Sequence, residues 1–238
     1  MNYVFDVDGT LTPSRKRIDP TFEEWFLNFI KNHPVYLVSG SDYPKTLEQL
    51  GDEICKNVAG VYSCAGNALY VNGEEVYASP FELTTEEHEF LETLLNLSAY
   101  PERTGQHIEL RQGLCNFSIV GRGATNEQRE SYIHYDTAIN ERKNLTELIN
   151  TQFPRLEATI AGETGIDIYL KGKDKSQVAD KLSPFVFFGD KIHEGGNDLT
   201  IALRAEQFYK VNSWEDTFGI LRQLFPLTLK DQGVITSL

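Results

Sequence analysis

The chain has 238 residues, enough for one large domain or two smaller ones with a sizeable hydrophobic core. Its net charge of -13 argues against a nucleic-acid partner, which would favour a basic surface. No apolar run approaches the length of a membrane span, and no signal peptide precedes the first acidic cluster, so we expect a cytoplasmic protein without membrane contact. The three cysteines, Cys55, Cys64 and Cys115, show no metal-binding spacing and are expected to be reduced, buried thiols.

The first third of the chain alternates strands and helices. A short apolar strand ends at Phe5, and Asp19-Pro20 supplies the N-cap and first-turn proline of a helix that ends near Asn32. One face of this helix carries the core residues Phe22, Trp25, Phe26, Phe29 and Ile30. The elements expected next are a strand at 35–38, a helix at about 43–50 and a strand near 58–62. Strands joined by helical crossovers predict a parallel sheet.

The pattern changes near residue 80. Thr84 or Thr85 begins a helix, and Gln112-Gly113 forms a hairpin-like turn between two strands. The elements expected here are strands at 107–111, 114–120, 156–161 and 166–170 and helices near 126–134 and 143–152. We interpret residues 82–173 as an inserted α+β domain with an antiparallel sheet.

From Asp174 the first pattern returns, so residues 1–81 and 174–238 are expected to form one domain that the insertion interrupts. The expected elements are a helix from Asp174, strands at 185–188 and 208–211 and a closing helix at 214–225. We expect an active site in the crevice between the two domains. The tail from Thr228 is expected to be poorly ordered.

Two carboxylates, Asp6 and Asp8, follow the first strand and precede Gly9-Thr10. Alternate residues of a strand share a face, and ligands bind at the carboxyl ends of parallel strands. A close carboxylate pair is costly unless a hard cation such as Mg²⁺ lies nearby. The pair alone would equally suit an acidic turn, but the apolar strand before it and Gly-Thr after it favour a functional site.

A second acidic cluster follows the strand at 185–188, where Gly189-Asp190 leads into a glycine-rich loop that ends at Asp198. Asp6, the main-chain carbonyl of Asp8 and Asp190 can supply oxygen ligands for Mg²⁺, with Asp198 in support. Lys175, near the start of a helix, can hold a carboxylate and a phosphate together as a point charge. Taken alone, it would be read as an ordinary surface lysine.

The order of these motifs resembles the haloacid dehalogenase (HAD) superfamily: Asp6-Val7-Asp8-Gly9-Thr10, Ser39, Lys175 and Gly189-Asp190 through Asp198. The match is closer to the eukaryotic-type α-phosphomannomutases and covers nearly the whole chain. The insertion contributes Ile108-Glu109-Leu110-Arg111, Asn116-Phe117-Ser118 with Gly121-Arg122, and Glu127-Gln128-Arg129. The resemblance implies a HAD-like α/β core of Rossmann type, with the insertion as its α+β cap.

The resemblance further implies Asp6 as nucleophile, Asp8 as general acid/base and Asp190 as a metal ligand. The implied substrate contacts are Arg15, Ser39, Gly40, Ser41, Arg111, Arg122, Arg129, Gly165 and Asp167. The resemblance also implies a Mg²⁺ cofactor, a hexose 1,6-bisphosphate activator, a phosphorylated hexose substrate and a homodimer formed through the cap. The expected reaction interconverts mannose 6-phosphate and mannose 1-phosphate, for GDP-mannose biosynthesis. An aspartyl-phosphate on Asp6 would divide the phosphoryl transfer into two easier steps.

The chain departs from this family's pattern at a few positions. Ser39 replaces a glycine, Gly165 replaces a serine, and Gly172-Lys173-Asp174-Lys175 lacks the usual tryptophan. The family's Glu-Asn-Gly is Cys64-Ala65-Gly66. The alternative is therefore a Mg²⁺-dependent sugar-phosphate phosphatase that uses the same Asp6 and Asp8.

Overall fold

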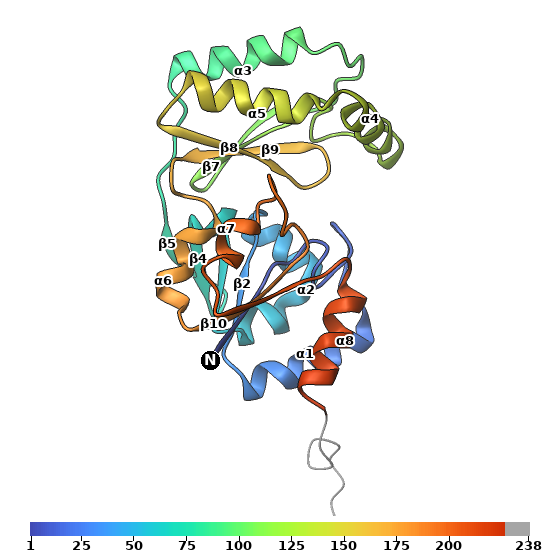
Figure 1. The fold of residues 1–238 in the computed structure, drawn as a ribbon, viewed down its shortest axis with the longest axis vertical. Helices are drawn as coiled ribbons and strands as arrows, with labels where there is room; N and C mark the ends of the chain where they lie inside the picture. Colours follow the sequence, from blue (N-terminus) through green and yellow to red (C-terminus); the bar gives the residue numbers. More distant parts are fainter. Residues whose placement is uncertain (227–238) are drawn as a thin grey trace, which may run out of the picture.

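A mixed sheet carries the N- and C-terminal parts of the chain in the computed structural model, which describes residues 1–226 (Figure 1). Within that range the strand order is β11-β10-β1-β2-β3-β4-β5. The strands are β1 (Asn2–Phe5), β2 (Val35–Val38), β3 (Gly60–Ser63), β4 (Ala68–Val71), β5 (Glu74–Ala78), β10 (Phe185–Gly189) and β11 (Gln207–Lys210). The tail from Thr228, expected to be poorly ordered, lies outside the described residues.

The strands from β11 to β3 are parallel, as the alternation of strands and helices predicts. In the register of the sheet, Phe5 of β1 lies opposite Phe188 of β10 and Leu37 of β2. The rings of Phe5 and Phe188 stack with their centroids 4.7 Å apart. Because the strands run in the same direction, the polar segments that follow β1, β2 and β10 emerge at one edge of the sheet.

Three helices support this sheet: α1 (Pro20–Asn32), α2 (Tyr43–Asn57) and α8 (Trp214–Leu224). The N-cap of α1 is Asp19, whose carboxylate accepts hydrogen bonds from the backbone N–H groups of Thr21 and Phe22. The predicted apolar face of α1 is buried, and Phe22 stacks on Phe218 of α8 at 4.8 Å. Burial of such a ring stabilises the fold by about 2 kcal/mol.

The edge of the sheet beyond β3 is antiparallel, so the sheet is mixed and not wholly parallel as predicted. Strands β4 and β5 form a hairpin whose turn, Asn72-Gly73, has positive φ at both residues. Asn-Gly is the residue pair that favours a type I′ hairpin turn, and this signal was missed in the sequence. Helix α2 is also longer than predicted, because it continues to Asn57 beyond an interruption at Gly51.

The insertion forms a second, antiparallel sheet with the strand order β6-β7-β9-β8. Its strands are β6 (Ile108–Arg111), β7 (Leu114–Phe117), β8 (Leu156–Ala161) and β9 (Gly165–Leu170). Its helices are α3 (Thr85–Leu97), α4 (Asn126–Ile139) and α5 (Glu141–Gln152). Figure 1 shows the helices on the face of this sheet that is turned away from the larger sheet. The predicted fold class, an α/β core with an α+β cap, is confirmed; the boundaries at residues 82 and 173 stay predictions.

Some predicted elements differ in extent. The strand expected at 114–120 ends at Phe117. The helix expected from Asp174 is a 3₁₀ turn, η2 (Lys175–Val178), followed by a single α-helical turn, α6 (Ala179–Leu182). Asp174 starts η2 by accepting a hydrogen bond from the Ser176 N–H. Two further short elements, η1 (Cys64–Gly66) and α7 (Leu199–Ala202), were not predicted.

The three cysteines are free and buried, which confirms the expectation of unpaired thiols. Burial raises the pKa of each thiol to about 12. They are therefore protonated and poor nucleophiles at neutral pH. Within residues 1–226, no helix is both long and apolar enough to cross a membrane.

Candidate active site

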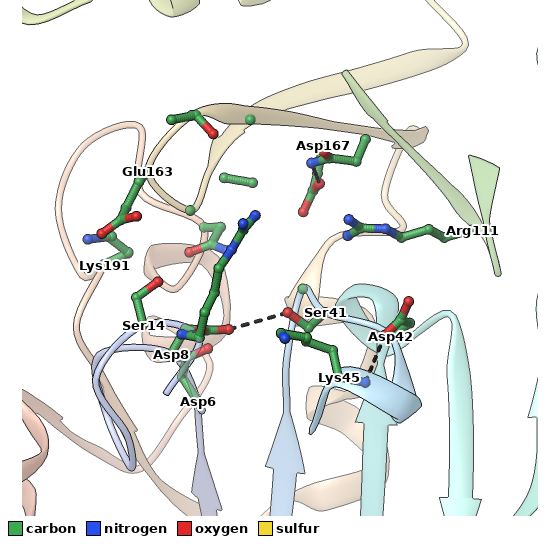
Figure 2. Close-up of a pocket in the computed structure, with 18 of the residues that line it drawn as sticks. Asp6, Asp8, Ser14, Ser41, Asp42, Lys45, Arg111, Glu163, Asp167 and Lys191 are labelled. Carbon is green, nitrogen blue, oxygen red and sulfur yellow. Dashed lines mark hydrogen bonds between the residues drawn. The ribbon is translucent and has the colours of Figure 1, made fainter. Parts of the chain in front are cut away.

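An open cavity lies between the carboxyl edge of the large sheet and the sheet of the cap (Figure 2). The core residues that line the cavity come from the ends of β1, β2 and β10. The cap residues that line it come from β6, β7, β9 and their loops. The predicted site residues on its wall are Asp6, Asp8, Arg15, Gly40, Ser41, Arg111, Arg122, Gly165, Asp167 and Asp190. The structure therefore brings together, from both domains, most of the residues that the sequence singled out.

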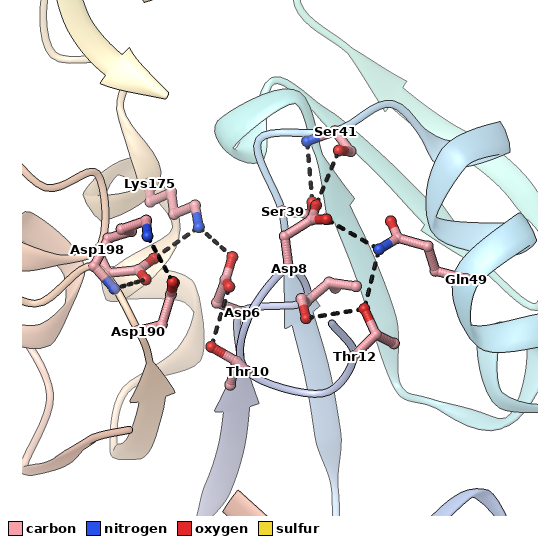
Figure 3. A network of polar contacts seen from close by, with 12 residues as sticks. Asp6, Asp8, Thr10, Thr12, Ser39, Ser41, Gln49, Lys175, Asp190 and Asp198 are labelled. Atoms are coloured by element: carbon pink, nitrogen blue, oxygen red, sulfur yellow. Dashed lines mark hydrogen bonds and ion pairs between the residues drawn. The ribbon is translucent and has the colours of Figure 1, made fainter. Parts of the chain in front are cut away.

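Asp6 is a buried carboxylate on the cavity wall, with 5% of its surface exposed. Its Oδ1 accepts a hydrogen bond from Lys175 Nζ at 2.6 Å, and its Oδ2 accepts one from Thr10 Oγ1 at 3.1 Å (Figure 3). Burial, together with the charges of Asp198 and Asp190, raises the pKa of Asp6 well above its ordinary value, against the opposing charge of Lys175.

Asp8 is held by three donors. Its Oδ1 accepts from the Arg15 backbone N–H at 2.8 Å and from Gln49 Nε2 at 3.0 Å, and its Oδ2 accepts from Ser41 Oγ at 3.3 Å. Gln49 is buried, and its Nε2 also lies 3.0 Å from Thr12 Oγ1. The role of Gln49 was missed in the sequence, because it lies on α2, 41 residues from Asp8.

Asp6, Asp190 and Asp198 each offer a carboxylate oxygen within 4.8 Å of the others. Burial raises the pKa of Asp190 although Lys191, 2.9 Å away, opposes that shift. Oxygen donors at this spacing, two of them with raised pKa, suit a hard divalent cation that would relieve their repulsion. Gly9, at φ +87°, permits this packing, since a Cβ there would lie 2.6 Å from Asp190 Oδ2.

Lys175 and Asp198 lie behind the cavity wall, where they support it. Lys175 is 1% exposed and donates to Asp6 Oδ1 at 2.6 Å and to Asp198 Oδ1 at 2.7 Å. The second oxygen of Asp198 accepts the Lys191 backbone N–H at 3.0 Å. Although burial opposes it, the charges of Asp198 and Asp6 raise the pKa of Lys175, so this lysine keeps its proton throughout the neutral range. Asp198 therefore accepts hydrogen bonds from the Lys175 side chain and from the backbone of the loop after Asp190.

The cap places two arginines opposite the core carboxylates. Arg111 and Arg122 form ion pairs with one carboxylate, Glu109, and Arg122 Nε lies 3.2 Å from its Oε2. Although burial opposes it, Asp167 and Glu109 raise the pKa of Arg111. Asp167 itself is buried, and Gly40 of the core lies so near that a Cβ there would be 3.1 Å from Asp167 Oδ2. Core and cap therefore meet directly at the site.

Arg15 lies on the cavity wall, where the charges of two cap arginines act on it. Burial and the charges of Arg129 and Arg122 lower the pKa of Arg15 to about 10. Arg129, on α4, does not line the cavity: its side chain donates to Glu163 Oε2 at 2.7 Å and to Thr164 Oγ1 at 3.2 Å. Arg15 and Arg122, which both line the cavity, give its wall positive charge that would favour an anion such as phosphate.

Ser39 also differs from the expectation that it contacts substrate. It is buried and absent from the cavity wall, and its Oγ accepts the Ser41 backbone N–H at 3.0 Å. In this loop, the serine that lines the cavity is Ser41. Ser39 therefore shapes the loop after β2, and Ser41 presents the polar group.

Gly165 has a local role in positioning Asp167. Asn116 Nδ2 donates to Asp167 Oδ1 at 2.7 Å, and a Cβ at Gly165 would lie only 2.7 Å from the same Nδ2. The absence of a side chain at Gly165 thus leaves space for the bond between Asn116 and Asp167. Further residues of the wall that the sequence did not single out as site residues are Ser14, Asp42, Lys45, Ala161, Gly162, Glu163, Thr164, Lys191 and Asn197.

The fold is similar to that of HAD-superfamily proteins of known structure. Solved structures with a similar fold include a HAD subclass IIB sugar phosphatase, with TM-score 0.59, 16% identity and coverage of 94% of this chain and 98% of that one. A haloacid dehalogenase-like hydrolase from Bacteroides thetaiotaomicron has TM-score 0.57 and 14% identity, with 94% and 99% covered.

Sequence comparison identifies the family within this superfamily. The family model described as eukaryotic phosphomannomutase matches residues 22–227. The phosphomannomutase of Spinacia oleracea is 35% identical, over 96% of this chain and 96% of that one. The phosphomannomutase of Saccharomyces cerevisiae is 31% identical, over 94% of each chain. The chain belongs to the eukaryotic phosphomannomutase family and is an enzyme of that family.

Proposed function

We propose that this enzyme interconverts mannose 6-phosphate and mannose 1-phosphate through an aspartyl-phosphate and a hexose 1,6-bisphosphate. The observation that carries the proposal is the pairing of Asp6 and Asp8 on the core with Arg111 and Arg122 on the cap, across one cavity. A mutase must hold one phosphate at its nucleophile and a second phosphate at the far end of the sugar. Arginine forks suit that second phosphate because they bind it through two hydrogen bonds.

In the proposed reaction Asp6 attacks the phosphorus of a bound hexose 1,6-bisphosphate, and the bond from phosphorus to the sugar oxygen breaks. Asp8 supplies a proton to that oxygen and takes a proton from the sugar hydroxyl that later attacks the aspartyl-phosphate. Hydrogen bonds from Gln49 and Ser41 fix the orientation of the Asp8 carboxylate for these proton transfers. Lys175, bonded to Asp6, balances negative charge at the nucleophile.

Asp6, the Asp8 carbonyl and Asp190 are proposed to hold Mg²⁺, with Asp198 in support. When bound, this cation would offset the charge of the phosphoryl oxygens next to the carboxylate cluster. The clustering of Asp6, Asp190 and Asp198 oxygens within 4.8 Å supports this assignment. The cap lies over the cavity and is proposed to exclude water from the aspartyl-phosphate.

Phosphorus NMR with mannose 1-phosphate, Mg²⁺ and a trace of glucose 1,6-bisphosphate tests the proposal. We expect mannose 6-phosphate to form in a reaction that depends on the bisphosphate, without an equal amount of inorganic phosphate. Inorganic phosphate as the main product would replace the mutase proposal by the alternative, a sugar-phosphate phosphatase with the same Asp6. Absence of both products would contradict both functions for these substrates.

Replacing Gln49 by methionine is expected to lower kcat by about tenfold while KM stays near the wild-type value. The variant keeps the volume of the side chain but removes the N–H that fixes Asp8 Oδ1. A misplaced proton donor slows the chemical step without weakening the binding of phosphate. Steady-state kinetics over a pH series measure the effect, and Gln152→Met, on the exposed end of α5, is the matched control. An unchanged kcat and pH profile would contradict a positioning role for Gln49.

The homodimer through the cap, the cytoplasmic location and the place in GDP-mannose biosynthesis stay predictions. The preferred hexose is part of the proposal, and the NMR experiment can be repeated with glucose phosphates to determine it.

A further inference from the structure

Glu163 is an acidic residue on the wall of a cavity proposed to bind phosphate. It lies in the turn between β8 and β9, and Figure 2 shows it on the cap side of the cavity. Its side chain is 45% exposed, so it is far less enclosed than Asp6 or Asp167. A carboxylate at this place repels an incoming phosphate.

Glu163 also forms an ion pair with the guanidinium group of Arg129. Arg129 Nη2 donates to Glu163 Oε2 at 2.7 Å, and its Nη1 donates to Thr164 Oγ1 at 3.2 Å. The Arg129 side chain is 8% exposed, while Glu163 and Thr164 both line the cavity. The carboxylate of Glu163 therefore lies at the cavity wall and binds Arg129 as an anionic ligand would.

The charge of Arg129 nevertheless acts on the cavity. Among the charges near Arg15, that of Arg129 makes the largest contribution to the lowered pKa of Arg15, and Glu163 opposes it. Arg15 is itself on the cavity wall. Arg15, Arg122 and Glu163 line the same cavity, so a phosphate bound between Arg15 and Arg122 would share that cavity with the carboxylate that pairs with Arg129.

Glu163 lies in an open turn, where 45% of its side chain is exposed. The neighbouring Gly162, at φ +55°, has no atom within 4 Å of the place where its Cβ would be. Glu109 provides a contrast, since it lies within strand β6 and binds both Arg111 and Arg122. Glu109 therefore orients two arginines from a paired strand, whereas Glu163 binds one arginine from an open turn.

We propose that Glu163 is a built-in competitor for the distal phosphate: its carboxylate binds Arg129 in the free enzyme, and a substrate phosphate displaces it. The inference rests on the proposed function, in which cap arginines bind the distal phosphate, and it adds Arg129 to that site. Glu163 then sets the affinity for phosphorylated sugars, because each binding event must break its ion pair with Arg129.

The variant Glu163→Gln tests this inference. We expect its KM for mannose 1-phosphate to fall about three- to fivefold, the order expected when one partly exposed charge is removed, with kcat unchanged or lower. Glu89→Gln makes the same change of charge on the exposed surface of α3 and is expected to leave KM unchanged. An unchanged or raised KM in Glu163→Gln would overturn the inference, because a residue that merely orients Arg129 would weaken binding when removed.

Calorimetric titration with inorganic phosphate separates this inference from the proposed function. We expect Glu163→Gln to bind phosphate about three- to fivefold more tightly than the wild type at low ionic strength. The gain is expected to disappear in Glu163→Gln/Arg129→Met, measured against Arg129→Met alone, with thermal melting to confirm that each variant is folded. A gain that persists without Arg129, or no gain at all, would overturn the inference. If mutase activity is absent but this gain depends on Arg129, the proposed function fails and the competition stands.

Discussion

Replacing Asp6 by asparagine is expected to lower turnover on the order of 10⁴-fold or more, because the variant lacks the nucleophilic oxygen of the proposed reaction. The substitution keeps the shape of a side chain that is 5% exposed. Lys175 retains its bond to Asp198, and the repulsion of Asp6 with Asp190 and Asp198 is removed. We therefore expect a folded protein with a melting temperature close to that of the wild type.

The decisive measurement for Asp6 is capture of the phosphoenzyme by intact-protein mass spectrometry after rapid quenching with acid. An aryl phosphate is a suitable donor, since its leaving group needs no proton from Asp8. We expect a phosphoryl adduct in the wild type and in Asp8→Asn, and none in Asp6→Asn. An adduct in Asp6→Asn, or turnover within about tenfold of the wild type, would exclude Asp6 as the nucleophile.

Replacing Lys175 by methionine is expected to lower both stability and activity. Lys175 is 1% exposed and lies between Asp6 and Asp198, at 2.6 and 2.7 Å. Methionine fills much of the same volume but leaves buried carboxylates without their cation. Breaking a buried ion pair from one side costs about 3–5 kcal/mol of stability. Loss of the charge beside the nucleophile is expected to lower kcat on the order of 10²- to 10³-fold.

The pH dependence of this variant follows from the direction of the pKa shifts. In the wild type the pKa of Lys175 is raised, so its stabilisation is complete below the ordinary lysine pKa and is lost only above it. In Lys175→Met, Asp6 has no such cation, and burial raises its pKa above the unfolded value of about 3.9. Such groups favour the folded state only when protonated. The variant is thus expected to lose stability as the pH rises from 5 to 8.

Urea unfolding at pH 5 and pH 8 measures this effect, with and without Mg²⁺. The matched control is Lys181→Met, on α6, where the lysine is exposed. We expect the control to unfold at nearly the wild-type urea concentration at both pH values. Addition of Mg²⁺ is expected to recover part of the lost stability, because a cation bound by Asp6 and Asp190 would compensate their charge. An unfolding midpoint of Lys175→Met equal to that of the wild type would contradict the structural role.

Local chemistry made much of the fold predictable. The period of Phe22, Trp25, Phe26 and Phe29 identifies a helix with one buried face, and the structure buries all four. The two hairpins of the cap were predicted from pairs of strand-like stretches around the turn residues Gln112-Gly113 and Gly162–Gly165. Strands β4 and β5 were missed because β5 is exposed along its whole length and so lacks an apolar pattern.

The sequence by itself determined the fold class, the order of the motifs and the position of Asp6, Asp8 and Asp190 at the ends of strands. These follow from local patterns, since the end of a buried parallel strand is defined by the residues next to it. The partners of these residues were decided only by the tertiary structure. Lys175 is 169 residues from Asp6 in sequence, and the order of the parallel strands brings them to 2.6 Å.

The same limit applies to the cap. Sequence motifs indicated Arg129 as a substrate contact, but only the packing of α4 against the β8–β9 turn gives it Glu163 as a partner, 34 residues away. Likewise, the effect of Gly165 depends on Asn116, which pairing of β7 with β9 brings alongside Asp167. Such contacts depend on strand register and helix packing, and these are determined by many weak interactions along the whole chain. A local pattern of residues therefore identifies the chemical groups of this site, and the tertiary structure decides which of them act on one another.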